Sequence, residues 1–471
     1  DAKFTDSNGD GGWHSVLVGA LGAGAQGIYA LDVTDPSPTT ANELVLWEFT
    51  DASGSDAEGG ALDGRDMGYN LALPAIVRID DNLSDDTEPT WVVLVGNGYA
   101  STELDADGNP DDDTDGVPAC EDDDDPGNCT ISQTGHAVLY VLKLGGGDDN
   151  RILARMDTGV GTVADPNGLM EVSTLDENND LIADRAYAGD AFGNVWRFDL
   201  VDTTQPPTRI FQAQDEHGNP QPISSRIAFT RHPNGGHMLL FGTGRFINDD
   251  DKTDLSVQSF YGIWDDAGTV HPAAGGGFQE VERASLIQHE FLATVNVQDT
   301  ETRTIVSLGR TSTTDENPKY QPTGDIRGWM IDLVVNDSNG VSNKEGERVV
   351  VAPQVRQGRV VFVSLIPGDC CDAGGNSWIN ALDALDGSRL EMTPFDFNLD
   401  GNFNAHDLLD VAGDPDAVGS SIRIGTGIYS APSMLGMGAG EVMGIISDSE
   451  GDLIQLEESG AFGWRTWLQL Q

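Results

Sequence analysis

Oxygen-bearing side chains at alternate positions predict a cation site in the segment DENNDLIAD. The oxygen donors at its odd positions are Asp176, Asn178, Asp180, the backbone carbonyl of Ile182, and Asp184. Calcium takes about six to eight oxygen ligands, and a loop with carboxylates or amides on alternate residues can wrap it. We therefore predict calcium here; a solvated turn rich in Asp and Asn is the alternative.

A second loop, DFNLDGNFNAHD, spans Asp396 to Asp407 and follows a longer calcium-binding pattern. Its oxygen donors and its central glycine are Asp396, Asn398, Asp400, Gly401, Asn402, Asn404 and Asp407. The spacing and the glycine at position six match a calcium loop, with Asp in place of Glu at the last position. The loop resembles those of dockerins, so we expect an autonomous calcium site. The following run, LLDVAG, is predicted to begin a short helix.

Four cysteines form two close pairs in the sequence. Cys120 and Cys129 enclose the acidic segment EDDDDPGN, and a disulfide between them would imply an oxidising compartment. Zinc is the alternative, although no CxxC motif or flanking histidine supports it. Cys370 and Cys371 can bond to each other or stay unpaired. The acidic insertion, residues 101–132, is predicted to be a surface loop that contains a disulfide between Cys120 and Cys129.

Motifs for catalysis are scarce. The chain contains no HExxH and no GxSxG motif. Gly22, Gly24 and Gly27 fit GxGxxG, but they connect two predicted strands and open no helix, which argues against a dinucleotide site. We expect a protein that is not an enzyme.

The composition is strongly acidic. The formal net charge is −53 at pH 7, which makes nucleic acid and anionic membrane poor partners. No run of about 18 apolar residues is present, so we expect no membrane span. The chain opens on DAKFTDSNGDGG without an apolar core, as expected of a mature secreted form or of a piece of a longer chain.

The elements that must position the two loops are recurring pairs of short strands. Each pair is an apolar run, a turn and an aromatic-containing run; the seven pairs begin at Ser15, Trp91, Asp184, His237, Thr302, Arg359 and Val442. No such unit can bury its own face alone, which favours the blades of one β-propeller over residues 1–471, with a β-sandwich as the alternative. Aromatic residues at comparable places are expected to pack between blades: Tyr29, Tyr140, Trp196, Tyr261, Trp329 and Trp378.

Ordered motifs along nearly the whole chain resemble one known family. These are GAGAQGIYALDVTDPSP, LWEFTD, MGYNLALPAIVRI, VLVGNGYAS, DRAYAGDAFGNVWRFDL, LLFGTGRFI, QSFYGIWD, GERVVVAPQ, SWINALDALDGSRL and GWRTWLQL. Together they resemble the C-terminal domain of the PilY family of type IV pilus tip-associated adhesins. The resemblance implies an all-β, quinoprotein-like, modified seven-bladed propeller.

The resemblance also implies a function. It predicts an extracellular protein at the pilus tip, exported through the periplasm and outer membrane. Its expected partners are minor pilins and a host or abiotic surface, and its expected roles are pilus assembly, adhesion and twitching motility. Calcium at Asp176, Asn178, Asp180 and Asp184 would modulate pilus extension and retraction. None of these motifs corresponds to the variable N-terminal region of the family, so roles that belong to that region are not expected to transfer.

Two other functions remain open from the sequence. Quinoprotein dehydrogenases also combine propellers, calcium and, in some cases, adjacent cysteines such as Cys370 and Cys371. Both calcium loops look self-sufficient, however, which leaves no obvious open coordination position for a quinone. A calcium-dependent lectin fits the composition, but no cluster of sugar-stacking aromatic residues is evident.

Overall fold

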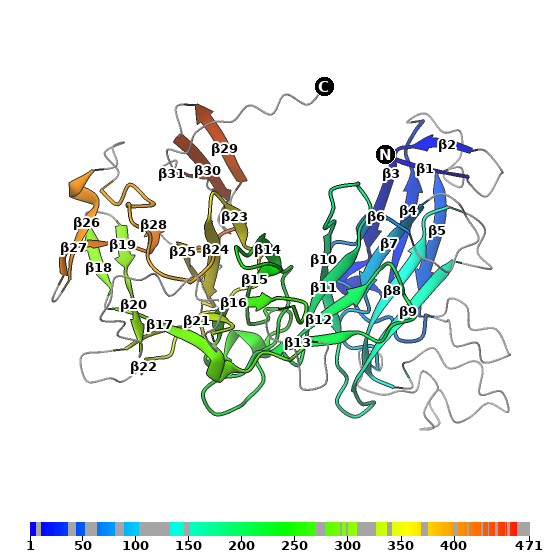
Figure 1. Ribbon diagram of the computed structural model, residues 1–471, viewed down its shortest axis with the longest axis horizontal. Coiled ribbons are helices and arrows are strands. Elements are labelled where there is room, and N and C mark those ends of the chain that lie inside the picture. The colour runs from blue at the N-terminus through cyan, green and yellow to red at the C-terminus, as the bar shows by residue number, and fades with distance from the viewer. Residues whose placement is uncertain are drawn as a thin grey trace. The chain divides into compact units, whose positions relative to one another are not determined.

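A computed structural model of the chain is built almost entirely from β-strands (Figure 1). Short runs of Val, Ile, Leu and aromatic residues between Gly, Asp and Asn turns favour strands over helices. The structure describes residues 1–5, 11–35, 44–51, 64–80, 89–102, 132, 134–145, 151–269, 278–292, 294–297, 300–308, 326–336, 342–368, 375–398, 404–411, 414–424, 427–431, 433–438, 441–447, 449 and 453–458. Within these residues the helical turns are short 3-10 segments, and no helix is long and apolar enough to cross a membrane.

The chain divides into two compact units. Unit 1 comprises residues 1–213 and 222–227, and unit 2 comprises residues 214–221 and 228–471. The connecting chain therefore passes between the units more than once.

Within the described residues, unit 1 contains three antiparallel sheets in which strands that follow one another in the sequence are neighbours. The first is β3 (Val16–Ala20), β4 (Gly27–Asp32) and β5 (Val45–Thr50). The second is β6 (Ala75–Ile79), β7 (Thr90–Gly96), β8 (His136–Lys143) and β9 (Ile152–Gly161). The third is β10 (Leu169–Leu175), β11 (Arg185–Asp190), β12 (Asn194–Asp199) and β13 (Thr208–Gln212). A hairpin of β1 (Ala2–Thr5) and β2 (Gly11–His14) completes the unit.

The sheets of unit 1 stack face to face, as propeller blades do. On β8, Leu139 and Val141 pack with residues of the third sheet, whereas Val138 and Tyr140 pack with residues of the first. Because successive side chains of a strand point to opposite faces, β8 is buried on both sides. Each such buried aliphatic side chain contributes about 1.5–3 kcal/mol of transfer free energy.

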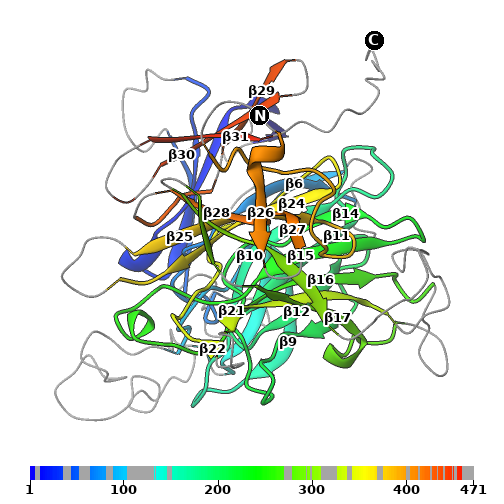
Figure 2. The same cartoon turned by 90° about the vertical axis from the view of Figure 1, so that its left-hand side faces the viewer.

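The described part of unit 2 contains two large sheets, of seven and six strands, and two small sheets. The first has the order β14 (Ala228–Arg231), β15 (His237–Gly242), β16 (Ser259–Asp265), β21 (Gly328–Asn336), β17 (Leu286–Phe291) and β20 (Ile305–Leu308), with β22 (Ser342–Asn343) paired to β21. The second has the order β18 (Val295–Val297), β19 (Thr300–Arg303), β28 (Ser421–Ile424), β25 (Asn376–Asp383), β24 (Arg359–Ile366) and β23 (Gln354–Arg356). The small sheets are β26 (Leu408–Val411) with β27 (Asp414–Val418), drawn in orange in Figure 2, and β29 (Ser433–Gly438), β30 (Glu441–Ser447) and β31 (Leu453–Glu458).

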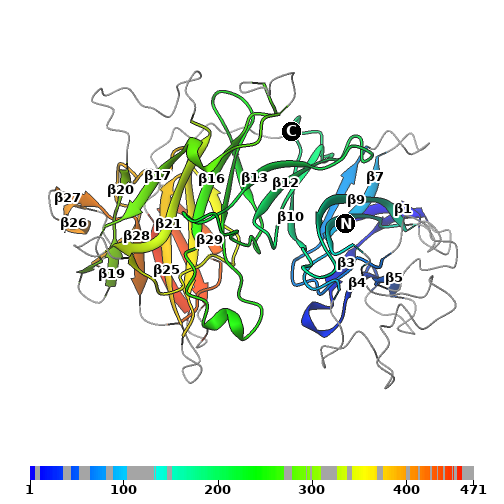
Figure 3. The same ribbon diagram turned by 90° about the horizontal axis from the view of Figure 1, so that it is seen from below.

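The predicted all-β class is confirmed, and six of the seven predicted strand pairs form antiparallel pairs. The pair predicted from Thr302 is wrong: β20 pairs with β17, while β21 pairs with β16 and lies parallel to β17 (Figure 3). β21 therefore lies inside the sheet that begins with β14, between β16 and β17. The count of seven blades and the single-domain assignment stay predictions.

The short helix predicted after Asp407 is also wrong. Leu408–Val411 is strand β26, and only a 3-10 turn, Ala405–Asp407, precedes it. The alternation of buried Leu409 and Val411 with outward Leu408 and Asp410 fits a half-buried strand.

Candidate functional site

The Asp176 loop connects two neighbouring strands of the third sheet in unit 1. β10 ends at Leu175 and β11 begins at Arg185, and these two residues face each other in the antiparallel ladder. The backbone N–H of Asp184 donates to the carbonyl oxygen of Leu175 at 2.9 Å, which closes the loop at its base. The loop is therefore an extended hairpin connection whose two ends are fixed.

The acidic side chains of this loop turn back toward its own backbone. Asp176 accepts hydrogen bonds from the N–H groups of Asn179 (2.6 Å) and Leu181 (2.8 Å). Further along, Asp180 accepts from the N–H of Ile182 at 2.9 Å, and Asp184 accepts from that of Glu177 at 2.7 Å.

Two residues of the loop have a left-handed backbone conformation. Asn179 has a φ of 62° and Leu181 a φ of 68°, which is costly for a leucine. The Leu181 side chain is 79% exposed, so apolar burial does not offset this cost. This tight winding places the N–H groups of Asn179 and Leu181 within hydrogen-bond distance of the Asp176 carboxylate.

The structure places the predicted ligands in one short loop but does not gather them into a closed coordination shell. Among the described residues, no three His, Cys, Asp or Glu side chains lie close enough together to hold a metal ion. Backbone N–H groups instead contact the carboxylates of Asp176, Asp180 and Asp184. The donor set consists of oxygen atoms, which fits a hard cation such as calcium, and binding would require these N–H contacts to rearrange.

The closing residue of the loop is tied to the core of unit 1. Ala183 is buried, and its N–H donates to the carbonyl oxygen of Arg78 on β6 at 2.8 Å. The carbonyl oxygen of Asp184 accepts from the N–H of Leu200 at 3.0 Å. A change of loop geometry at Asp184 would therefore act directly on two sheets.

The opposite end of β11 holds a buried carboxylate that the sequence analysis did not single out. Asp190 accepts from the side-chain N–H groups of Trp196, Asn194 and Asn167, each at 2.8 Å. Burial raises its pKa, and these donors lower it in part. The segment DAFGNVW could have indicated this site, because it places Asp190, Asn194 and Trp196 around one tight turn. An Asp at the start of a turn can accept hydrogen bonds from the residues of that turn.

The second loop lies in unit 2, and part of it is described. Asp396 and Asn398 are buried, and Asp407 is fully buried. The Asp407 carboxylate accepts from the N–H groups of Phe397 (3.0 Å) and Asn404 (2.9 Å). Asp400 and Asn402 lie outside the described residues. The structure thus brings both ends of the loop, Asp396 and Asp407, to one place.

The two ends of this loop place the carboxylates of Asp396 and Asp407 near each other. Burial raises the pKa of Asp407, and the nearby Asp396 carboxylate raises it further, whereas the backbone N–H donors lower it. Two buried carboxylates that repel each other are an arrangement that a bound cation would neutralise. The described oxygen donors fit calcium at this loop as well.

The remaining predicted features can be placed only in part. Cys120 and Cys129, like Cys370 and Cys371, lie outside the described residues, and so does most of the acidic insertion. In the GxGxxG match, Gly22 and Gly24 lie in a 3-10 turn between β3 and β4, and Gly27 is the first residue of β4. Of the six singled-out aromatic residues, all but Tyr29 are buried in the core: Tyr140, Trp196, Tyr261, Trp329 and Trp378.

Comparison with known proteins gives a consistent result. The family model of the PilY1 beta-propeller domain matches residues 2–114 and 127–296, which is more than half of the chain. A type IV pilus biogenesis factor PilY1 homolog of Xylella fastidiosa is 30% identical over 409 residues, covering 82% of this chain and 23% of that protein. The type IV pilus biogenesis factor PilY1 of Pseudomonas aeruginosa strain PAO1 is 30% identical over 424 residues, covering 83% of this chain and 30% of that protein.

The structural comparison points to the same fold. The crystal structure of the Pseudomonas aeruginosa PilY1 C-terminal domain superposes with a TM-score of 0.68 at 23% identity, covering 95% of this chain and 80% of that one. The chain spans about a quarter to a third of the length of these two curated relatives.

Proposed function

Because this chain belongs to the PilY1 beta-propeller family, we propose that it is the propeller part of a non-enzymatic, calcium-binding factor of type IV pili. Family membership is the observation that carries this proposal. The curated relatives are named as type IV pilus biogenesis factors, a name that describes assembly and no catalysed reaction. We propose that the protein lies outside the cell at the pilus tip, where it contacts minor pilins and a host or abiotic surface.

We propose calcium as its ligand, bound at both loops. The Asp176 loop offers side-chain oxygens at alternate positions, and the Asp396 loop has two buried carboxylates near each other. Calcium would supply positive charge that replaces the N–H donors now facing the carboxylates. The residues that would hold it are Asp176, Asn178, Asp180, Ile182 through its carbonyl and Asp184, and in the second loop Asp396, Asn398, Asp400, Asn402 and Asp407.

The Asp176 loop is the better candidate for regulation. Its last ligand, Asp184, directly precedes β11, and the adjacent Ala183 is hydrogen-bonded to β6. Calcium there would change the stiffness of two sheets, whereas the Asp396 loop is followed only by the small β26–β27 sheet. We propose that the first site lets calcium modulate pilus extension and retraction, and with them adhesion and twitching motility.

A calcium titration tests the ligand. After chelation, added calcium is expected to raise the melting temperature, because binding to the folded state alone stabilises that state by mass action. Asp180→Ala is expected to remove the part of this rise that belongs to the first loop. Asp165→Ala is the matched control, since Asp165 is exposed and lies in unit 1 outside the loop. An equal rise in wild type and Asp180→Ala would contradict calcium binding at this loop.

The pilus role needs a separate measurement. Deleting the gene is expected to lower the number of surface pili and to reduce twitching, and the wild-type gene should restore both. Complementation with Asp180→Ala is expected to restore pilus number but alter twitching. Unchanged pili and twitching after deletion would refute the pilus role while leaving calcium binding intact, so the two proposals fail independently.

A further inference from the structure

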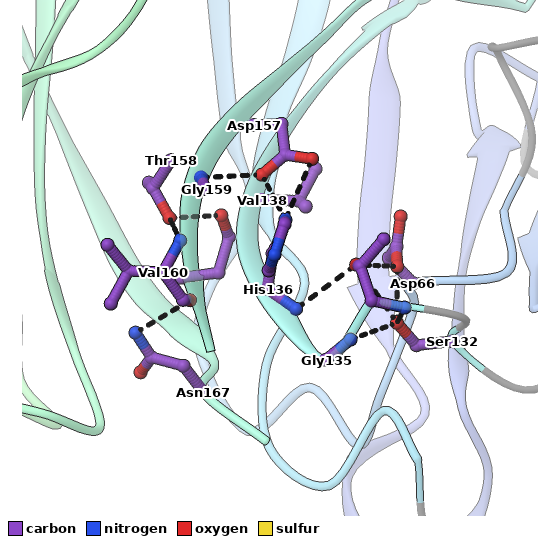
Figure 4. A network of polar contacts seen from close by, with 12 residues as sticks. Asp66, Ser132, Gly135, His136, Val138, Asp157, Thr158, Gly159, Val160 and Asn167 are labelled. Carbon is purple, nitrogen blue, oxygen red and sulfur yellow. Dashed lines mark hydrogen bonds and ion pairs between the residues drawn. The ribbon is translucent and has the colours of Figure 1, made fainter. Parts of the chain in front are cut away.

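The ends of the acidic insertion are held by a polar network that the calcium proposal does not involve (Figure 4). The N–H of Ser132 donates to the carbonyl oxygen of Ser101 at 3.0 Å, which joins the two ends. On the exit side, the hydroxyl groups of Ser132 and Thr134 both donate to one oxygen of Asp66, the second at 3.1 Å. The Asp66 carboxylate is therefore the anchor of the exit segment.

Asp66 forms an ion pair with Arg155, and the guanidinium of Arg155 also contacts a second carboxylate, that of Asp157. Arg155 on β9 donates from Nε to the other Asp66 oxygen at 2.8 Å, and its Nη2 contacts the same oxygen. Its Nη1 donates to Asp157 at 3.1 Å. The pKa of Arg155 is raised, because its attraction to Asp66 and Asp157 outweighs the burial that lowers it.

A histidine completes the chain of contacts. His136, the first residue of β8 after the insertion, lies with Nδ1 at 2.9 Å and 3.1 Å from the two oxygens of Asp157. The imidazole is 25% exposed, so it can exchange protons with solvent. Among the described residues, Asp157 contacts His136 directly. Arg155 and Asp66 are linked to His136 through Asp157, and Tyr140 of β8 lies close to Arg155.

The charge of this network depends on His136. With a neutral imidazole, two carboxylates share one guanidinium and the network carries one net negative charge. Protonation of His136 gives each carboxylate its own cation and makes the network neutral. Residues 103–131 contain many Asp and Glu residues and no Lys or Arg, so a neutral base also reduces electrostatic repulsion at their attachment point.

We propose that His136 is a proton-sensitive latch that tightens the base of the acidic insertion on acidification. With a protonated imidazole, each carboxylate at the base has its own cation, beside the hydroxyl contacts of Ser132 and Thr134 to Asp66. With a neutral imidazole the same hydroxyl contacts remain, but the two carboxylates share the guanidinium of Arg155.

Hydrogen exchange of the peptide from Ser132 to Val138 tests the latch. Its amides at Ser132, Gly135 and His136 are hydrogen-bonded within the base. After correction for intrinsic exchange rates, local opening in wild type is expected to be about threefold less frequent at pH 5.5 than at pH 8, the size expected of a partly exposed ion pair. Equal opening at both pH values would overturn the proposal without any variant.

Two variants test whether the pH dependence of local opening comes from His136. His136→Gln keeps a hydrogen-bond donor near Asp157 but cannot titrate, so its opening is expected not to depend on pH. His217→Gln is the control, because His217 is 69% exposed and lies in unit 2; it should behave as wild type. Equal melting temperatures at pH 8 would establish that His136→Gln is folded. Retention of the pH effect in His136→Gln would overturn the assignment to this residue.

Discussion

His232 is held in its neutral form by its contacts. The ring stacks on Trp264 with 4.0 Å between centroids, and its Nδ1 accepts a hydrogen bond from the N–H of Asn234 at 3.2 Å. A proton on Nδ1 would break that bond. Burial lowers the pKa of His232 from 6.5 to about 4.

This shift predicts how stability depends on pH. The unfolded chain binds a proton at His232 from about pH 6.5 downward, whereas the folded chain binds it only near pH 4. The contribution of His232 to the free energy of unfolding is therefore complete above pH 6.5 and is lost as the pH falls toward 4. His232→Phe keeps a ring on Trp264 but cannot titrate, so its melting temperature should fall less between about pH 7 and pH 5 than that of wild type. His217→Gln should match wild type, and an unchanged slope in His232→Phe would contradict the assignment.

At the scale of elements, close pairing of strands depends on a few glycines. Gly262 of β16 faces Trp329 of β21 across the sheet, and a Cβ atom at Gly262 would lie 2.2 Å from the indole Nε1. Trp329 is fully buried and donates to the carbonyl oxygen of Ala384 at 3.3 Å. A Cβ atom at Gly262 would therefore require the buried indole to shift.

Gly262→Ala is therefore expected to destabilise unit 2 by about 1–3 kcal/mol, the usual cost of overpacking a core. Gly12→Ala is the control, because a Cβ atom there meets nothing within 4 Å. Urea unfolding followed by tryptophan fluorescence should show a lower midpoint for the first variant and an unchanged one for the second. Equal midpoints would show that the indole can move at little cost.

At the scale of the whole molecule, charge opposes folding. The net charge is −53, while several arginines are buried where they offset little surface charge: Arg151, Arg303, Arg327, Arg348 and Arg359. Arg303 illustrates this use, since it forms ion pairs with buried Glu347 at 2.8 Å and lies between the rings of Phe291 and Trp378. The surface carboxylates consequently repel one another in the folded state.

Salt is therefore expected to stabilise the protein. Raising NaCl from about 0.05 M to about 1 M shortens the Debye length severalfold and should raise the melting temperature by several degrees. A chelator present throughout separates this screening effect from calcium binding. A melting temperature that stays constant or falls with added salt would show that surface repulsion does not limit stability.

The sequence alone was sufficient for the all-β class, most strand pairs and the membership suggested by its motifs, because these depend on local patterns. Alternating apolar runs specify strands, and a short turn between two runs specifies their pairing, as in β7–β8 and β11–β12. Spacing likewise marked the Asp176 and Asp396 loops as candidate calcium sites, since their predicted ligands are close in sequence.

Only the tertiary structure decided what depends on contacts between distant residues. β21 pairs with β16 and β17 although neither is its neighbour in sequence, so local pattern predicted the wrong partner. Asp66, Arg155 and His136 meet because three separate segments of unit 1 converge at the base of the acidic insertion. The carboxylates of the Asp176 loop turn toward backbone N–H groups, an orientation that spacing does not specify. Such arrangements arise from the packing of whole sheets, which fixes side-chain positions that no single segment determines.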